Sequence, residues 1–238
     1  MKFMVMHKMN EALEKGVRDP EVMAGVGQLI GEAIENKVFL SGAGLKPTAT
    51  RTQVVYRGGE RAITDGPFAE AKELVGGFAL MKVRDKAEAL RWCDRFASVV
   101  GDVELIMGPV YEPWEVGLGE KPQSPPLRYL SVMKINPDED RVPDPAEFAK
   151  MGALIEEMTT AGVLLSTGGL ASTKKGARIR FEGGKHRIID GPFAESKELI
   201  AGFSIVELPS KAAAIDWGVR FGRVAKVSEV EVREMPEW

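Results

Sequence analysis

The chain has 238 residues, of which 44% are hydrophobic and 28% charged, and its formal net charge is −3. This balance is typical of a globular protein of one or two domains, and it excludes the basic excess that a nucleic-acid or anionic-membrane surface needs. The chain has one cysteine, Cys93, which cannot form an intramolecular disulfide. One cysteine and two histidines are together too few for a four-ligand Cys/His zinc site.

The N-terminal sequence lacks the apolar core of a signal peptide, and no stretch approaches the roughly 20 apolar residues that span a bilayer. We therefore expect a cytoplasmic protein with no cofactor, no metal, no nucleic-acid partner and no membrane partner.

The sequence contains one unit twice. Residues 65–78 read DGPFAEAKELVGGF and residues 190–203 read DGPFAESKELIAGF, so that 11 of 14 positions are identical. Between the copies lies a Gly/Pro-rich segment typical of a linker. The sequence thus predicts a first domain at 1–115, a linker at 116–126 and a second domain at 127–238.

In the first copy, apolar alternation predicts a strand at 3–8. Asp19 followed by Pro20 predicts a helix that runs to about Asn36, because Pro favours the first helical position. The rest follows in chain order: a strand at 38–40, a hairpin around Gly58-Gly59, a strand at 74–83, an amphipathic helix at 86–99 and a strand at 103–107.

The second copy repeats this order. The pattern predicts a strand at 129–135, a helix that begins after Asp144 and ends near Ala161, and a strand at 163–165. A hairpin around Gly183-Gly184 follows, then a strand at 199–208, an amphipathic helix at 211–224 and a closing strand at 229–233.

With the hairpin treated as an insertion, each copy reads β-α-β-β-α-β, which is the split βαβ or ferredoxin-like unit. We predict an α+β protein of two tandem ferredoxin-like domains. The helices of such a unit cover one face of its sheet. Two copies in one chain would cover the other face for each other, as a pseudo-dimeric α/β barrel.

The two Asp-Gly-Pro-Phe segments, 65–68 and 190–193, with the Ala-Glu, Lys-Glu-Leu and Gly-Phe that follow each, resemble the YCII-related family and its DGPF-motif branch. The resemblance covers nearly the whole chain. It implies a ferredoxin-like fold paired into a dimeric α/β barrel, and a cleft suspected of enzymatic activity.

Some relatives use a His-Asp pair as an acid/base dyad, with the histidine in the first helix. Neither predicted first helix of this chain contains a histidine, so the dyad cannot be carried over. The resemblance also implies a regulatory association, because DGPF-type members are often encoded near alternative sigma factors.

Asp65 and Asp190 are the first candidate site residues. A carboxylate on a loop before a strand can act as a general base or anchor a polar group of a substrate. The alternative is that each aspartate caps its own turn through nearby backbone N–H groups.

A second candidate set lies just beyond each motif, where a lysine is flanked by carboxylates. Lys72 and Lys197, with Glu70 and Glu195, suit an anionic ligand. The alternative is a set of solvated or interfacial ion pairs.

The third set comes from the first strand of each copy. Alternation places His7 on one face with Phe3 and Val5, and the same face of the second copy carries Tyr129 and Ser131. We expect the wholly apolar opposite face to pack on the helices. His7, Tyr129 and Ser131 would then line a polar pocket between the sheets, with His7 either a catalytic group or a structural one.

Two functions remain open at this point. The chain binds a small polar or anionic molecule between its sheets, with proton-transfer chemistry of the lyase, isomerase or hydrolase type, or it is a non-catalytic protein-interaction or regulatory module. The duplication makes it an intrachain pseudo-dimer that can work alone or assemble further.

Overall fold

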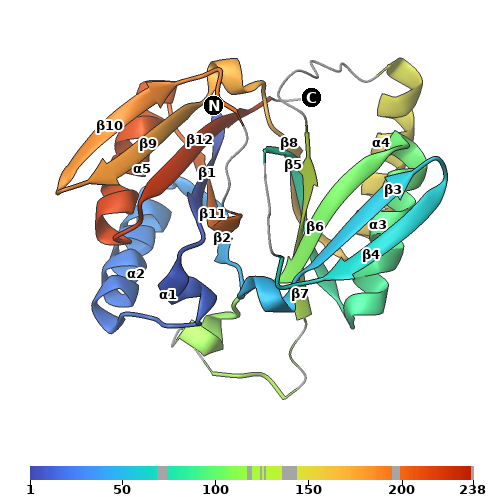
Figure 1. Cartoon of the computed structure of the whole chain (residues 1–238), viewed down its shortest axis with the longest axis horizontal. Coiled ribbons are helices and arrows are strands. Elements are labelled where there is room, and N and C mark those ends of the chain that lie inside the picture. The colour runs from blue at the N-terminus through green and yellow to red at the C-terminus, as the bar shows by residue number, and fades with distance from the viewer. Residues whose placement is uncertain are drawn as a thin grey trace. The chain divides into compact units, whose positions relative to one another are not determined.

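The structure is a computed structural model that describes residues 1–68, 74–116, 120–123, 125, 127–135, 144–194 and 199–236. Within these residues, two six-stranded antiparallel sheets and five α-helices make up an α+β fold (Figure 1). The chain divides into two compact units. The described residues of 1–47 and 169–238 form the first unit, and those of 48–69 and 74–168 form the second.

The sheet of the first unit has the strand order β10-β9-β12-β1-β11-β2. Four of these strands, in the order β12-β1-β11-β2, form the ferredoxin-like core, and β9 and β10 extend it as a hairpin. The strands are β1 (Lys2–Lys8), β2 (Phe39–Gly44), β9 (Ala177–Glu182), β10 (Lys185–Asp190), β11 (Ile200–Glu207) and β12 (Glu229–Met235).

The sheet of the second unit repeats this arrangement as β4-β3-β6-β7-β5-β8. Here β6-β7-β5-β8 is the ferredoxin-like core, and β3 and β4 form the added hairpin. The strands are β3 (Thr52–Arg57), β4 (Glu60–Asp65), β5 (Val75–Val83), β6 (Val103–Pro109), β7 (Leu127–Lys134) and β8 (Leu164–Gly169).

Each unit combines segments of both sequence copies. The first unit takes β1 and β2 from the first copy and β9 to β12 from the second, while the second unit combines β7 and β8 with β3 to β6. The division at 1–115, 116–126 and 127–238 stays a prediction from the repeated sequence, and the compact units of the described residues follow a different division.

Four of the five described helices begin where the sequence predicts. The five helices are α1 (Glu11–Glu14), α2 (Pro20–Glu35), α3 (Lys86–Val100), α4 (Pro145–Thr160) and α5 (Lys211–Val224). The carboxylate of Asp19 accepts a hydrogen bond from the backbone N–H of Glu21, and that of Asp144 accepts one from the backbone N–H of Glu147, so each aspartate is the N-cap of the helix that follows it. The short helix α1 is an addition to the predicted elements.

Two helices cover one face of each sheet, α2 with α5 in the first unit and α3 with α4 in the second (Figure 1). In the first unit, Phe3 and Val5 of β1 pack with Leu29 of α2 and with Trp217 and Phe221 of α5. The face of β1 that packs on the helices is therefore that of Phe3, Val5 and His7.

The predicted orientation of the first strands was wrong. The ring centroids of His7 and of Phe221 in α5 are 5.5 Å apart. Ser131 Oγ lies 3.8 Å from Sγ of Cys93 in α3. Tyr129 also packs in the helix-side core of the second unit. Hydrophobic alternation could not choose the helix-side face, because both faces of these strands are rich in apolar side chains.

Candidate functional site

The two aspartates of the repeated motif lie at the ends of the exposed hairpin strands β4 and β10. Asp65 is ion-paired with Lys86 and accepts a hydrogen bond of 2.6 Å from Thr52 Oγ1. Asp190 Oδ1 lies 2.8 Å from Lys211 Nζ. Lys86 and Lys211 are the first residues of α3 and α5, so each carboxylate ties a motif loop to the start of a helix.

These contacts keep Asp65 ionised. The hydrogen bond from Lys86, followed by that from Thr52, lowers the pKa of Asp65 below its ordinary value of 3.8. The side chain is also 62% exposed. A low pKa makes a carboxylate a weak proton acceptor, so the surroundings of Asp65 favour a structural ion pair over a general base.

Lys86→Met is expected to raise the pKa of Asp65 back toward 3.8, because the largest stabilising contact of the carboxylate is lost. A carbon-detected NMR titration of the aspartate carboxyls measures this change. Since the folded-state pKa lies below the unfolded value, the stabilisation is present above pH 4 and is lost as the pH falls through the folded-state pKa. Lys82→Met, an exposed change on β5, is the control and leaves the titration of Asp65 unchanged.

The remaining predicted site residues are not brought together. His7 belongs to the first unit, where it packs against Phe221, whereas Tyr129 and Ser131 belong to the second. Burial raises the pKa of Tyr129, as expected for a phenol in an apolar core. Glu70, Lys72, Glu195 and Lys197 lie outside the described residues.

A buried charged cluster lies on the sheet of the first unit instead, on the face opposite the helices. Arg178 of β9 is directly opposite Glu231 of β12, and Glu231 is opposite Met6 of β1. Because Val230 and Val232 pack on the helix side, alternation turns Glu231 and Arg233 to the other face. Lys8, Arg178, Glu231 and Arg233 are all buried, and we call them the Arg178–Arg233 cluster.

Glu231 is the centre of this cluster. Its Oε2 accepts a hydrogen bond of 3.0 Å from Arg178 Nε, and its Oε1 accepts one of 3.2 Å from Arg233 Nη1. Lys8 Nζ lies 3.8 Å from Glu231 Oε2, a distance too long for a hydrogen bond. One carboxylate is therefore shared by three cations.

Arg233 is fixed by the backbone as well as by Glu231. Its Nε and Nη2 donate hydrogen bonds of 3.1 and 2.5 Å to the carbonyl oxygen of Ala171. The side chain is fully buried and fills space beside Gly176, where an added Cβ would lie 2.8 Å from Arg233 Cδ. Gly176 is therefore required for this position of Arg233.

The repeated motif contributes to the cluster directly. The guanidinium carbon of Arg178 lies 4.2 Å from the centroid of the Phe193 ring, within the range of a cation–π contact. Phe193 is the phenylalanine of the second Asp-Gly-Pro-Phe segment, and the Gly191-Pro192 bond before it is cis, as is Gly66-Pro67. The motif loop thus places an aromatic ring on a buried guanidinium.

The charges of the cluster set the protonation of Glu231. Burial alone would raise the pKa of Glu231, but Lys8, Arg178 and Arg233 together lower it below its ordinary value. Burial also lowers the pKa of Arg233, and Glu231 offsets part of this effect. An arginine starts from so high a pKa that Arg233 remains charged.

The cluster has more positive than negative charge among the described residues. Its three cations face Glu231 and the neighbouring Glu229, whose Oε1 lies 3.7 Å from Arg178 Nε and whose Oε2 also accepts a hydrogen bond from exposed Arg180. Within the described ranges, Arg178 Nη2 is buried and has no hydrogen-bond partner. The cluster can therefore accept an anion.

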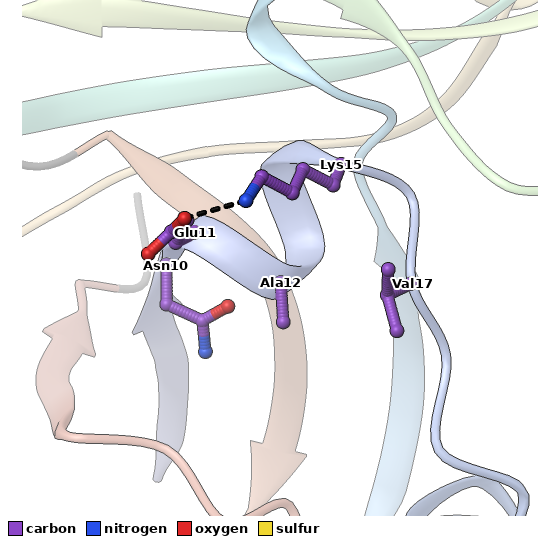
Figure 2. Close-up of a pocket in the computed structure, with 5 residues that line it drawn as sticks. All are labelled: Asn10, Glu11, Ala12, Lys15 and Val17. Carbon is purple, nitrogen blue, oxygen red and sulfur yellow. Dashed lines mark hydrogen bonds and ion pairs between the residues drawn. The ribbon is translucent and has the colours of Figure 1, made fainter.

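A shallow hollow of about 440 Å³ lies elsewhere in the first unit, beside α1, and Figure 2 shows its lining residues. The ammonium group of Lys15 is paired with Glu11 at 2.5 Å, and the Asn10 side chain caps α1 through the N–H of Leu13. The polar side chains of Asn10, Glu11 and Lys15 therefore already have partners within α1, which disfavours the hollow as a ligand site.

Cys93 of α3 is buried in the core between the helices and the sheet of the second unit. Burial raises the pKa of its thiol to about 11. A thiol with so high a pKa is not a nucleophile at neutral pH. Across the part of the chain that the structure describes, no group of three or more His, Cys, Asp or Glu side chains is placed to hold a metal ion. No described helix is long and apolar enough to cross a membrane.

Sequence reasoning missed the Arg178–Arg233 cluster, although one signal was present. Strand β12 begins with EVEVR at 229–233, which alternates charged and apolar side chains and so places Glu229, Glu231 and Arg233 on one face. Such alternation is normally typical of a solvent-exposed face. Here the charged side of the strand is buried.

These features define an α+β protein with two ferredoxin-like units. The family model of the YCII-related domain matches residues 1–103 and 127–238, so the chain belongs to the YCII-related family as two tandem copies. No curated protein matches the chain.

Proposed function

We propose that this protein binds a small singly charged carboxylate at the Arg178–Arg233 cluster. The observation that carries the proposal is the charge count among the described residues, where three buried cations face two carboxylates, one of which is shared with Arg180. Burying a charge without a counter-charge costs several kcal/mol, on the order of the whole stability of a domain. A bound anion would remove this cost.

The chemistry of the cluster suits a carboxylate. A guanidinium offers N–H donors in a planar fork that matches the two oxygens of a carboxylate, and Arg178 has one such nitrogen without a hydrogen bond among the described residues. Phe193 lies against the same guanidinium and offers an apolar surface to the rest of a ligand. The recurrence of Asp-Gly-Pro-Phe supports a place in the DGPF-motif branch, in which the loop would line this site.

The pKa directions favour binding over proton transfer. A general base or acid works best with a pKa near the operating pH. The pKa values of Asp65 and Glu231 are lowered and that of Tyr129 is raised, so all three move away from neutrality. Proton-transfer chemistry therefore has less support than binding.

A thermal-shift titration with formate, acetate, glycolate and benzoate, each against sodium chloride at equal ionic strength, tests the proposal. A ligand at 100 times its dissociation constant adds about 2.7 kcal/mol to the free energy of unfolding, so the best carboxylate raises Tm clearly above the chloride control. Arg178→Gln should reduce this rise at least several-fold, because it removes the guanidinium but keeps an amide.

Arg187→Met is the matched control, since Arg187 is an exposed arginine on the neighbouring strand β10. This variant should keep the full carboxylate effect. The absence of any shift with all four carboxylates would contradict the proposal and favour the alternative of a protein-interaction module. An equal loss in Arg178→Gln and Arg187→Met would show that the effect is a general one of surface charge.

A further inference from the structure

Strand β4 forms one edge of the sheet in the second unit. It pairs with β3 and with no other described strand, and it stands at one end of the order β4-β3-β6-β7-β5-β8 (Figure 1). All of its residues are exposed, which holds for no other strand in the described ranges. An exposed edge presents unpaired backbone N–H and C=O groups, and these can pair with a strand of another chain.

The backbone groups at this edge belong to every second residue of β4. The N–H of Gly66, which directly follows β4, donates to the carbonyl oxygen of Arg51 on the side of β3. Consecutive residues of a strand direct these groups to opposite sides, so the even-numbered residues of β4 bond to β3. The N–H and C=O groups of Arg61, Ile63 and Asp65 therefore point away from the sheet.

The side chains of these three residues are self-complementary. Arg61 is ion-paired with Asp94 of α3, and Asp65 with the first residue of that helix, so all three lie on the helix side of the sheet. In sequence order they are a cation, an isoleucine that is 41% exposed, and a carboxylate. If two β4 strands pair antiparallel around Ile63, each Ile63 faces its copy and each Arg61 faces an Asp65. The same register joins the outward backbone groups of each facing pair.

Both charged side chains can take a second partner. Lys86 and Thr52 both bind Oδ1 of Asp65, so neither contact uses Oδ2, and the side chain is 62% exposed. Both hydrogen bonds from Arg61 to Asp94 come from Nη1, and the Arg61 side chain is 43% exposed. The Arg61 of a second copy would therefore add to the ion pair of Asp65 without replacing it.

The equivalent edge strand of the first unit, β10, is protected against the same pairing. It repeats the exposed isoleucine as Ile188, but the neighbouring Arg187 is directly opposite Arg180 of β9. Pairing two β10 strands around Ile188 would bring the Arg187 of each copy close to the other on that face. Like charges on adjacent strands are destabilising, and charged side chains keep sheet edges unpaired. At the equivalent position β4 has the uncharged Ala62.

We propose that the chain forms a dimer with a second copy of itself, through antiparallel pairing of their β4 strands centred on Ile63. The pairing joins the second-unit sheets of the two copies into one continuous sheet, and its two-fold symmetry closes the assembly at two copies. One short strand from each copy is a small contact beside the roughly 1,200 Å² of a standard stable interface, so the dimer should dissociate on dilution. It does not involve the Arg178–Arg233 cluster or depend on the function proposed for it.

Sedimentation velocity of the full chain over a wide range of concentrations tests the dimer, and a charge exchange tests its register. The wild type should shift from monomer to dimer as its concentration rises. Arg61→Glu and Asp65→Lys should each weaken the association by about tenfold, because each places like charges opposite one another twice in the symmetric pair. An equimolar mixture of the two variants should restore it, since every cation then faces a carboxylate.

Ile63→Lys should abolish the association, because it places two charges at the centre of the contact. Ile188→Lys is the matched control at the equivalent isoleucine of β10 and should leave the association unchanged. Both side chains are exposed, so both variants should fold.

Amide hydrogen exchange of the wild type gives a reading that needs no variant. The N–H groups of Ile63 and Asp65 should exchange more slowly at high protein concentration than at low. Those of Ala62 and Thr64 bond to β3 in the monomer, so their exchange should not depend on concentration.

Four results would overturn the proposal. The first is a wild type that remains a monomer, with concentration-independent exchange at Ile63. The second is unchanged association in Ile63→Lys, which would place the contact elsewhere. The third is an equal loss in Ile63→Lys and Ile188→Lys, which would indicate pairing of β4 with β10. The last is a mixture of folded Arg61→Glu and Asp65→Lys that stays monomeric, which would contradict the facing of these two residues.

Discussion

Arg233→Met is expected to lower the free energy of unfolding by about 3–5 kcal/mol, the cost of removing one partner from a buried ion pair. The change removes the hydrogen bonds from the guanidinium to Glu231 and to the Ala171 carbonyl. It also leaves Glu231, which is only 1% exposed, with one cation fewer. Urea denaturation followed by circular dichroism measures the change.

Arg180→Met provides the comparison. The Arg180 guanidinium binds Glu229 at 2.9 Å, but its side chain is 56% exposed, so its loss should cost no more than about 1 kcal/mol. Equal effects of the two substitutions would show that burial of the Arg178–Arg233 cluster contributes nothing to its strength.

The double variant Arg233→Met/Glu231→Gln tests how strongly Arg233 and Glu231 interact. In Arg233→Met the Glu231 carboxylate still accepts a hydrogen bond from Arg178 and still faces Lys8, so replacing it leaves two buried cations without it. Glu231→Gln should therefore destabilise Arg233→Met further, but by less than it destabilises the wild type, because its contact with Arg233 is already lost. Strict additivity of the two single effects would instead indicate that Arg233 and Glu231 do not interact.

Local sequence signals predicted the secondary structure because each element has its own chemical start or end. Asp19 and Asp144 cap α2 and α4 before a proline, and Gly58 and Gly59 adopt the positive φ angles of the predicted hairpin turn. These determinants lie within a few residues of one another. They act independently of the rest of the chain, so they can be recognised in the sequence alone. The order of the elements that they define is the ferredoxin-like order β-α-β-β-α-β.

The exchange of segments between the copies could not be predicted in the same way. The two copies have nearly the same strand patterns, so β1 is chemically suited to the partners of either copy. In the structure β1 pairs with β11 and β12 of the second copy. Apolar periodicity specifies only the pattern of side chains that a strand beside β1 must have. The equivalent strands of the two copies have that pattern equally well, so periodicity cannot choose between them.

The site was missed for a related reason. The sequence draws attention to Asp65 and Asp190 because the motif repeats, yet the motif residue that reaches the cluster is Phe193, through Arg178. The four charged residues of the cluster come from β1, β9 and β12, which are distant in sequence. Only the sheet register brings them together, and the register depends on long-range pairing.

Gly191→Ala is the second substitution for which we expect a large effect. A Cβ at this position would lie 1.7 Å from the carbonyl oxygen of Thr173, a backbone atom that cannot rotate away. Overpacking of this kind costs about 3 kcal/mol, the upper end of its usual range. The loop must move to relieve the contact, which would carry Phe193 away from Arg178. A urea denaturation curve would measure the lost stability, and the glycolate titration would measure the lost binding in the first unit.

Gly152→Ala is the control, because the same substitution there meets no atom within 4 Å. Gly152 is exposed in the middle of α4, where alanine is favoured over glycine by about 1 kcal/mol, so this variant should be slightly more stable than the wild type.

Gly66→Ala should behave like Gly191→Ala, since its Cβ would lie 2.0 Å from the Thr48 carbonyl oxygen. If all three variants were equally stable, the glycines of the motif would not be required by the close approach of these backbones. If only Gly66→Ala and Gly191→Ala lose stability, the glycine of each Asp-Gly-Pro-Phe segment is explained by close packing of the backbone. Phe193 is then the residue through which the second motif acts on the Arg178–Arg233 cluster.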